Sequence, residues 1–154
     1  MPPRVALTMI AVALLAYACG PRSGTPVASS GPAVARPAAR LDRGVTSNVM
    51  IDTASGEVRF VIAVENASRK SVELDFPNGR THDFVVYRED GTEVWRWSTG
   101  RLFTQGMQNV LLESRDSVRY TERWSVPAKG RYTLVAQLLS ENYPVSQRVT
   151  FALK

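Results

Sequence analysis

The chain has 154 residues, of which 44% are hydrophobic and 21% charged, and its formal net charge is +5. Five arginines lie before residue 44, whereas residues 45–154 carry 14 Lys and Arg against 13 Asp and Glu, so this larger part is nearly neutral. This balance argues against nucleic-acid binding. A single histidine and a single cysteine exclude an intramolecular disulfide and a metal site built on several imidazoles.

The first 18 residues have the pattern of a secretory signal peptide. Arg4 is followed by an apolar run over residues 5–15, and small residues follow at Ala16 and Ala18. The apolar run is well short of the roughly 20 residues that a transmembrane helix needs. We therefore expect residues 1–18 to be removed during export.

Cys19, the only cysteine, directly follows this segment. The run Ala16-Tyr17-Ala18-Cys19 resembles the lipobox of bacterial lipoproteins, in which the cysteine becomes the lipidated first residue after cleavage. The resemblance implies a lipid on Cys19 and an exported protein that is anchored to a membrane of the bacterial cell envelope. The same residues also fit the A-x-A rule of ordinary signal peptidase, which would cut the same bond and leave a free thiol. Both alternatives predict export.

Residues 19–44 are dominated by Gly, Pro, Ala and Ser and offer almost nothing to bury. Such a composition predicts a disordered linker, because no buried surface offsets the entropy lost on ordering. A flexible chain of this length spans about 27 Å. We expect a tether that holds a domain clear of a membrane; a tail without a role is the alternative.

Residues 45–154 show apolar residues at alternate positions and are expected to form one domain. This period of two predicts strands with one face in a core and one in water. Turn residues separate the runs, and no helical period of 3.6 is seen, which favours a single antiparallel, immunoglobulin-like β-sandwich over a barrel. The predicted inward residues are Val58, Phe60, Ile62 and Val64; Val72, Leu74 and Phe76; Val118, Tyr120 and Trp124; Tyr132, Leu134, Ala136 and Leu138; and Val145, Val149, Phe151 and Leu153.

The segment 82–98 predicts a β-hairpin. Residues 84–87 are apolar on both faces, as in a central strand, and Asp90-Gly91 supplies a turn in which glycine takes a positive φ. The returning strand holds Trp95 and Trp97 on one face, and Arg96 on the other.

Several segments, in this order, resemble the BsuPI family of intracellular proteinase inhibitors. They are Asn66-Ala67-Ser68, residues 72–79, Asp83-Phe84-Val85-Val86, Asp90-Gly91, residues 93–98, Phe103, Gln105, Tyr120, Trp124 and residues 130–134. The resemblance implies an immunoglobulin-type sandwich and a binding protein rather than an enzyme, with a protease as partner. Because this chain carries an export signal, its target would lie outside the cytoplasm.

The tryptophans Trp95, Trp97 and Trp124 are the family signature, and we expect them to pack in the sandwich core. The alternative is an aromatic platform for a peptide or a sugar ring. Catalysis finds little support, because His82 and Asp83 are adjacent in a strand and point to opposite faces. We expect His82 to be a polar residue at a strand edge. The carboxylate pairs are expected to be solvated rather than calcium ligands: Glu73 with Asp75, and Glu89 with Asp90.

The predicted function is an exported, lipid-anchored binding module that blocks a protease sterically through a loop or a strand edge. The preferred loop covers residues 99–109 and carries Arg101, Leu102 and Phe103; residues 140–146 form a second candidate. The alternatives are a non-inhibitory interaction or scaffold domain of the cell envelope, and carbohydrate binding on the tryptophans. No cofactor, catalytic residue or metal ligand is predicted.

Overall fold

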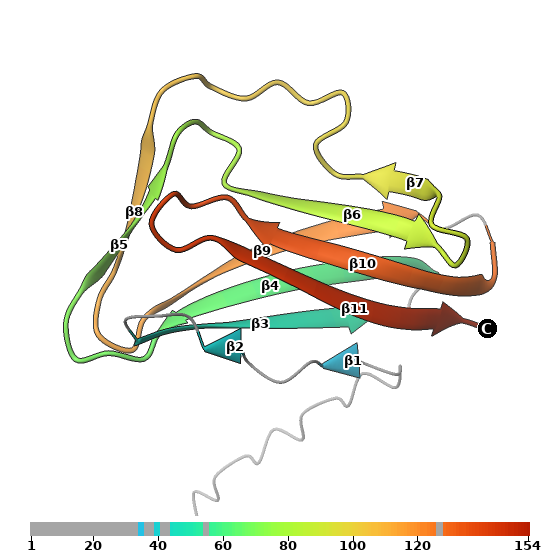
Figure 1. Ribbon diagram of the computed structural model, residues 1–154, viewed down its shortest axis with the longest axis horizontal. Helices are drawn as coiled ribbons and strands as arrows, with labels where there is room; N and C mark the ends of the chain where they lie inside the picture. Colours follow the sequence, from blue (N-terminus) through green and yellow to red (C-terminus); the bar gives the residue numbers. More distant parts are fainter. Residues whose placement is uncertain (1–33, 36–38, 41–43, 54–55, 126–127) are drawn as a thin grey trace, which may run out of the picture.

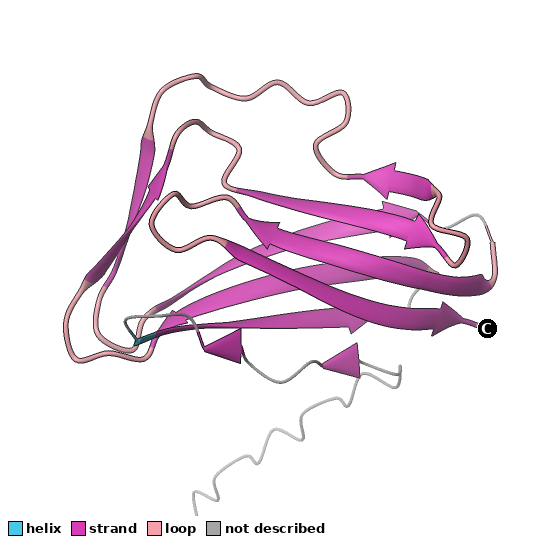
Figure 2. Cartoon of the chain, viewed as in Figure 1, coloured by secondary structure: helices cyan, strands magenta, loops and turns pink. Residues whose placement is uncertain are grey.

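The structure is a computed structural model that describes residues 34–35, 39–40, 44–53, 56–125 and 128–154. The described residues form β-strands joined by loops and turns, with every strand pair antiparallel, as Figure 2 shows. In this described part, no helix is long and apolar enough to cross a membrane. The all-β prediction is confirmed.

Two sheets pack face to face, and a smaller ladder lies at one end of them (Figure 1). The first sheet contains β1 (Val34–Ala35), β2 (Ala39–Arg40), β3 (Val45–Asp52), β4 (Glu57–Asn66) and β9 (Ser117–Ser125), in the order β1-β3-β4-β9 with β2 also on β3. The second has the order β11-β10-β6-β7 and contains β6 (His82–Arg88), β7 (Glu93–Arg96), β10 (Gly130–Leu138) and β11 (Val145–Leu153). The ladder pairs β5 (Val72–Phe76) with β8 (Gln108–Leu112).

The core lies between the two sheets. Phe60 of β4 contacts Phe84 of β6 and Phe151 of β11, each with ring centroids 5.9 Å apart. The predicted alternation is found along the strands, for example in the pattern of β11, where every second residue from Val145 to Phe151 is buried. Burial of these apolar faces is the main favourable term that holds the sheets together.

One buried pair of the core is polar. Ser47 of β3 and Gln147 of β11 are both buried, and Gln147 Nε2 donates to Ser47 Oγ at 2.6 Å and to its carbonyl oxygen at 3.2 Å. These bonds give Gln147 Nε2 and the two oxygens of Ser47 a buried partner, and they join β3 of one sheet to β11 of the other.

Four residues of the predicted linker 19–44 lie in described strands. Residues 34–35 and 39–40 form the short strands β1 and β2, which pair with β3. An unpaired edge of β3 would expose its N–H and C=O groups, and β1 and β2 cover part of that edge. The predicted signal peptide, 1–18, lies outside the described residues.

The predicted hairpin is formed by β6 and β7. Gly91 takes a φ of 86° in its turn, and its N–H donates to the carbonyl of Arg88 at 3.0 Å. Val85 lies opposite Arg96 and Val86 opposite Trp95, with an irregularity in register between Val86 and Tyr87. The strand β6 lies between β10 and β7, in agreement with its apolar residues on both faces.

Candidate functional site

The β7–β8 loop, residues 97–107, connects the second sheet to the end ladder and crosses the top of the molecule in Figure 1. It begins two residues before the predicted loop 99–109 and ends two residues before it, because residues 108–109 already belong to β8. A turn begins the loop: the N–H of Thr99 donates to Arg96 at 3.2 Å, and the N–H of Arg101 donates to Ser98 at 3.2 Å. Gly100 takes a φ of 74° there, which glycine adopts at less cost than residues with a Cβ atom.

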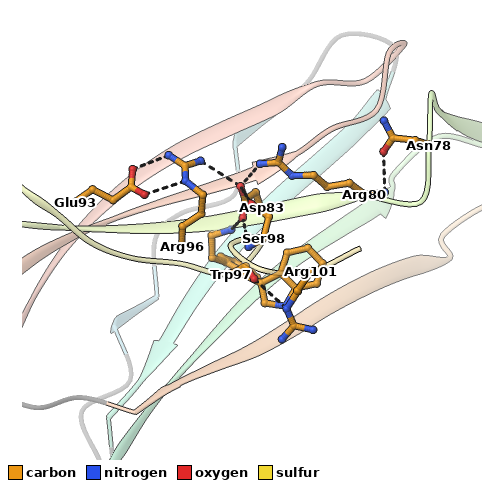
Figure 3. Close-up of polar contacts among 9 residues, drawn as sticks. Asn78, Arg80, Asp83, Glu93, Arg96, Trp97, Ser98 and Arg101 are labelled. Atoms are coloured by element: carbon orange, nitrogen blue, oxygen red, sulfur yellow. Dashed lines mark hydrogen bonds and ion pairs between the residues drawn. The ribbon is translucent and has the colours of Figure 1, made fainter. Parts of the chain in front are cut away.

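A buried carboxylate holds the start of this loop. The side chain of Asp83, on the outward face of β6, is fully buried. Its oxygens accept hydrogen bonds from Arg80, from Arg96 Nη1 at 3.3 Å, and from Ser98 through both its Oγ at 2.9 Å and its N–H at 3.2 Å. We call Arg80, Asp83, Arg96 and Ser98 the Asp83 cluster; Figure 3 shows how its side chains converge.

A second carboxylate extends the Asp83 cluster towards solvent. Glu93 accepts two hydrogen bonds from Arg96, from Nε at 3.0 Å and from Nη2 at 2.6 Å. Such a bidentate pair fixes the plane of the guanidinium group. Its hydrogen bonds lower the pKa of the Glu93 carboxyl and raise the pKa of Arg96. Arg96 therefore connects β7 to β6 while it remains charged.

On the inward face, aromatic rings support the loop. His82 lies between Trp97 and Tyr120, with ring centroids 4.1 Å and 4.5 Å away and both pairs stacked. Its Nε2 is 3.3 Å from Glu122 Oε1. Burial lowers the pKa of His82, and the hydrogen bond and charge of Glu122 oppose this shift. We call Trp97, His82 and Tyr120 the ring stack.

The prediction that His82 is a polar residue at a strand edge is wrong as regards its environment, because the residue is 6% exposed and packs between rings. Asp83 joins Arg80 and Arg96 on the other face of β6. His82 and Asp83 therefore lie on opposite faces of β6 and do not converge on one substrate.

The loop is fixed to the ring stack on both sides of its tip. Arg101 donates from Nε to the carbonyl oxygen of Trp97 at 2.9 Å, and its guanidinium carbon lies 4.8 Å from the centre of the Trp97 ring. Phe103 packs on the same indole, with ring centroids 5.4 Å apart. One residue further, the carbonyl of Thr104 accepts a hydrogen bond from the N–H of Gly79 at 2.9 Å.

Leu102 lies between these anchors and its side chain is 101% exposed. Single exposed apolar residues are common on protein surfaces, so the informative feature is that this leucine lies between two neighbours whose side chains are held on Trp97. The arrangement is a held backbone with an outward apolar side chain at its tip. It can fill a concave apolar site with little loss of conformational entropy.

The second predicted loop, 140–146, is tied to the end ladder. Asn142 donates from Nδ2 to the carbonyl oxygen of Glu73 at 2.9 Å and to Asp75 Oδ2 at 2.7 Å, and it accepts from the N–H of Asp75 at 3.1 Å. Ser140 and Val145 are buried. This loop offers no large exposed apolar side chain in the described structure, so it presents less to a partner than the β7–β8 loop does.

The tryptophans do not form a surface platform. Trp97 and Trp124 are 9% and 5% exposed, and Trp95 packs against the core with its ring 5.7 Å from Phe60 and 6.2 Å from Trp124. Sugar rings are bound by coplanar, accessible aromatic faces, which these residues do not offer. Among the described residues, no group of three His, Cys, Asp or Glu side chains is placed to hold a metal ion. Cys19, the predicted lipid attachment site, lies outside the described residues.

Comparison with known proteins identifies the domain. Residues 45–143 match the family of the intracellular proteinase inhibitor BsuPI. The chain belongs to this family. A crystal structure of a DUF1425 family member from Shewanella sp. pv-4 is also similar, with a TM-score of 0.32 and 12% identity, covering 77% of this chain and 96% of that one. No curated protein matches the chain.

The BsuPI match ends before β11, but β11 completes the sandwich. It pairs with β10 along its whole length and buries Val149 and Phe151 in the core. Residues 93–98 have a structural role in this domain: Trp95 and Trp97 pack against or in the core, and Arg96 and Ser98 bind Asp83.

Three supporting residues of this BsuPI domain were not singled out from the sequence. They are Arg80, Asp83 in its role as an acceptor, and Gly79. A carboxylate directly before the buried run Phe84-Val85-Val86 was a usable signal, since a buried charge needs a partner. The partners Arg96 and Ser98 are brought to it only by the pairing of β6 with β7.

Proposed function

We propose that this chain is an exported binding module that inhibits a protease by placing the β7–β8 loop in its active-site cleft. Family membership supports a proteinase-inhibitor-like function in general. One observation carries the choice of loop: Leu102 is wholly exposed between Arg101 and Phe103, whose side chains are held on Trp97.

A loop of this kind suits inhibition because its conformation is held before binding. A flexible segment loses backbone and side-chain entropy when it enters a cleft, and this loss weakens binding. Here the Asp83 cluster fixes the start of the loop, and Gly79 holds Thr104 after the tip. The chain contributes contacts rather than catalysis, so we propose a steric block.

Inhibition constants of the purified full chain against a panel of endoproteases test this proposal. We expect competitive inhibition of at least one protease, because the loop and the substrate would occupy the same cleft. A complete lack of inhibition across the panel at micromolar excess would contradict the proposal. A loop in which residues 101–103 are replaced by glycines is the matched variant, and it should inhibit much more weakly.

A second candidate function is a non-inhibitory interaction domain that uses strand edges. In the described part of the chain, β9 ends the first sheet and β11 ends the second, and each has one edge without a partner strand. Such edges bind extended segments of other proteins by adding a strand. Binding to an envelope protein without inhibition, lost when prolines are placed at the edge of β9, would favour this function.

We also propose that the protein is anchored in the bacterial cell envelope through a lipid on Cys19. The sequence pattern before Cys19 and the linker after it support this placement. In cells, the Cys19→Ala variant should leave the membrane fraction. If the variant and the wild-type protein partition identically, the lipid is not the anchor.

A further inference from the structure

We infer that the target protease has an apolar primary specificity pocket and that Leu102 is the residue that fills it. The inference rests on the proposed inhibition through the β7–β8 loop and names the partner class for that loop. A protease with an acidic pocket, which selects Arg or Lys, is the main rival, because Arg101 is the adjacent residue.

Arg101 is a poor candidate for the pocket because its side chain is already engaged. Its Nε binds the Trp97 carbonyl at 2.9 Å and its guanidinium group lies over the Trp97 ring at 4.8 Å. Its Nη2 is also 4.0 Å from Glu122 Oε2. Insertion into a deep pocket would break these contacts, so Arg101 acts as a positioning residue for its neighbour.

Phe103 is also turned towards the molecule. It is half-buried and belongs to the apolar residues that pack against the core, in contact with Trp97. Exposure of its ring would open the base of the loop. Met107 is 71% exposed, but it lies at the entry to β8, away from the anchored tip.

Unlike Arg101 and Phe103, Leu102 can leave water without breaking a contact with Trp97. Its branched aliphatic side chain carries no polar atom, so a pocket that receives it gains most by being apolar. A pocket with an acidic group at its base would bury an unpaired charge against leucine, which is costly. The chemistry of the tip therefore selects the chymotrypsin-like class of pocket over the trypsin-like class.

The test uses the full chain and two proteases, chymotrypsin with an apolar pocket and trypsin with an acidic one. We expect the wild-type chain to inhibit chymotrypsin, and Leu102→Ala to weaken that inhibition on the order of 100-fold. Leu102→Arg should weaken inhibition of chymotrypsin at least as much and should improve inhibition of trypsin. Leu111→Ala is the matched control, since Leu111 is also an exposed leucine, at 58%, but lies in β8.

The outcomes separate the inference from the proposed function. If the wild-type chain inhibits neither these two nor any other endoprotease, the proposed function fails and the inference fails with it. Suppose that the wild-type chain inhibits chymotrypsin but the inhibition constants of both Leu102 variants stay within about fivefold of the wild-type value. Leu102 would then be an energetically neutral contact, and the inference alone would be overturned. Stronger inhibition of trypsin by the wild-type chain, abolished by Arg101→Ala, would assign the pocket to Arg101 and also overturn it.

Discussion

The base and the tip of the β7–β8 loop differ in almost every physical respect. At the base, the charged groups are paired and the aromatic rings are stacked, and Asp83 alone accepts from three other side chains. At the tip, the side chain of Leu102 is fully in water. The base is built from buried groups that contact one another, and the tip is not. The difference indicates that the base holds the loop in place and that the tip is free to contact another molecule.

The base and the tip of the loop differ in how much they contribute to the stability of the free protein. At the base, removing one partner of a buried charge pair leaves the other charge without a partner, which lowers the stability of the fold. A side chain that contacts nothing adds nothing to the stability of the free protein. Leu102 can therefore vary with the partner at no cost to folding, and substitutions at the base and at the tip should affect different measurements.

The largest effect on folding is expected for Asp83→Ala. Its loss leaves Arg80, Arg96 and the Ser98 hydroxyl without their common acceptor. We expect the free energy of unfolding to fall by about 3 kcal/mol, at the lower end for a broken buried ion pair, because the two arginines are each about a third exposed and regain water. Urea unfolding of the variant and of the wild-type chain measures this loss in the free energy of unfolding. Asp90→Ala in the exposed β6–β7 turn is the control and should lose less; equal losses would contradict a special role for Asp83.

A smaller effect is expected for Gly79→Val, which acts where the loop contacts its support. A Cβ atom at Gly79 would lie 2.4 Å from Thr104 Oγ1 and 3.2 Å from the Thr104 nitrogen. The loop must shift, which should cost about 1–3 kcal/mol and weaken inhibition by displacing the tip. Gly106→Val is the control, since a Cβ there meets no atom within 4 Å. Unchanged inhibition by Gly79→Val would show that the support does not position the tip.

The pH dependence of the ring stack is expected to be weaker still. Burial lowers the pKa of His82 below its ordinary value of 6.5, so the unfolded chain binds the proton first as the pH falls. Stability from this group is complete above pH 6.5 and is lost as the pH falls below it, by at most about 1.4 kcal/mol per pH unit. Unfolding measured between pH 7.5 and pH 5 should show this slope, and the His82→Gln variant should lack it, because the chain has no other histidine. Identical slopes would contradict the account.

Much of the sandwich was predictable because the inward residues are apolar at alternate positions, without interruption in β4 and β5. The strand β3 was not, since the buried Ser47 breaks its apolar pattern, and its partner Gln147 lies far along the chain. The strand β8 was missed because Leu112 is its one fully buried residue. A strand can be predicted from the local sequence when apolar residues alternate along it. It cannot be predicted in this way where a buried polar residue, bonded to a partner far along the chain, takes the place of an apolar one.

The site was predictable in part. The composition of residues 99–109 indicated an exposed loop with Arg101, Leu102 and Phe103, but it treated these three residues alike. Their different roles depend on the Trp97 ring, which receives Arg101 and Phe103 and leaves Leu102 outside. Such a distinction arises from three-dimensional packing and has no signal in the residue types themselves.

The most direct test of the central claim is the inhibition constant of Leu102→Asp, compared with that of the wild-type chain against a protease with an apolar pocket. We expect the inhibition constant to increase by about 100-fold or more, because a carboxylate cannot enter such a pocket without a large desolvation cost. The free energy of unfolding should meanwhile stay within about 0.5 kcal/mol of the wild-type value, as for other surface substitutions. An inhibition constant within about fivefold of the wild-type value would contradict the claim that the tip of the loop binds the protease.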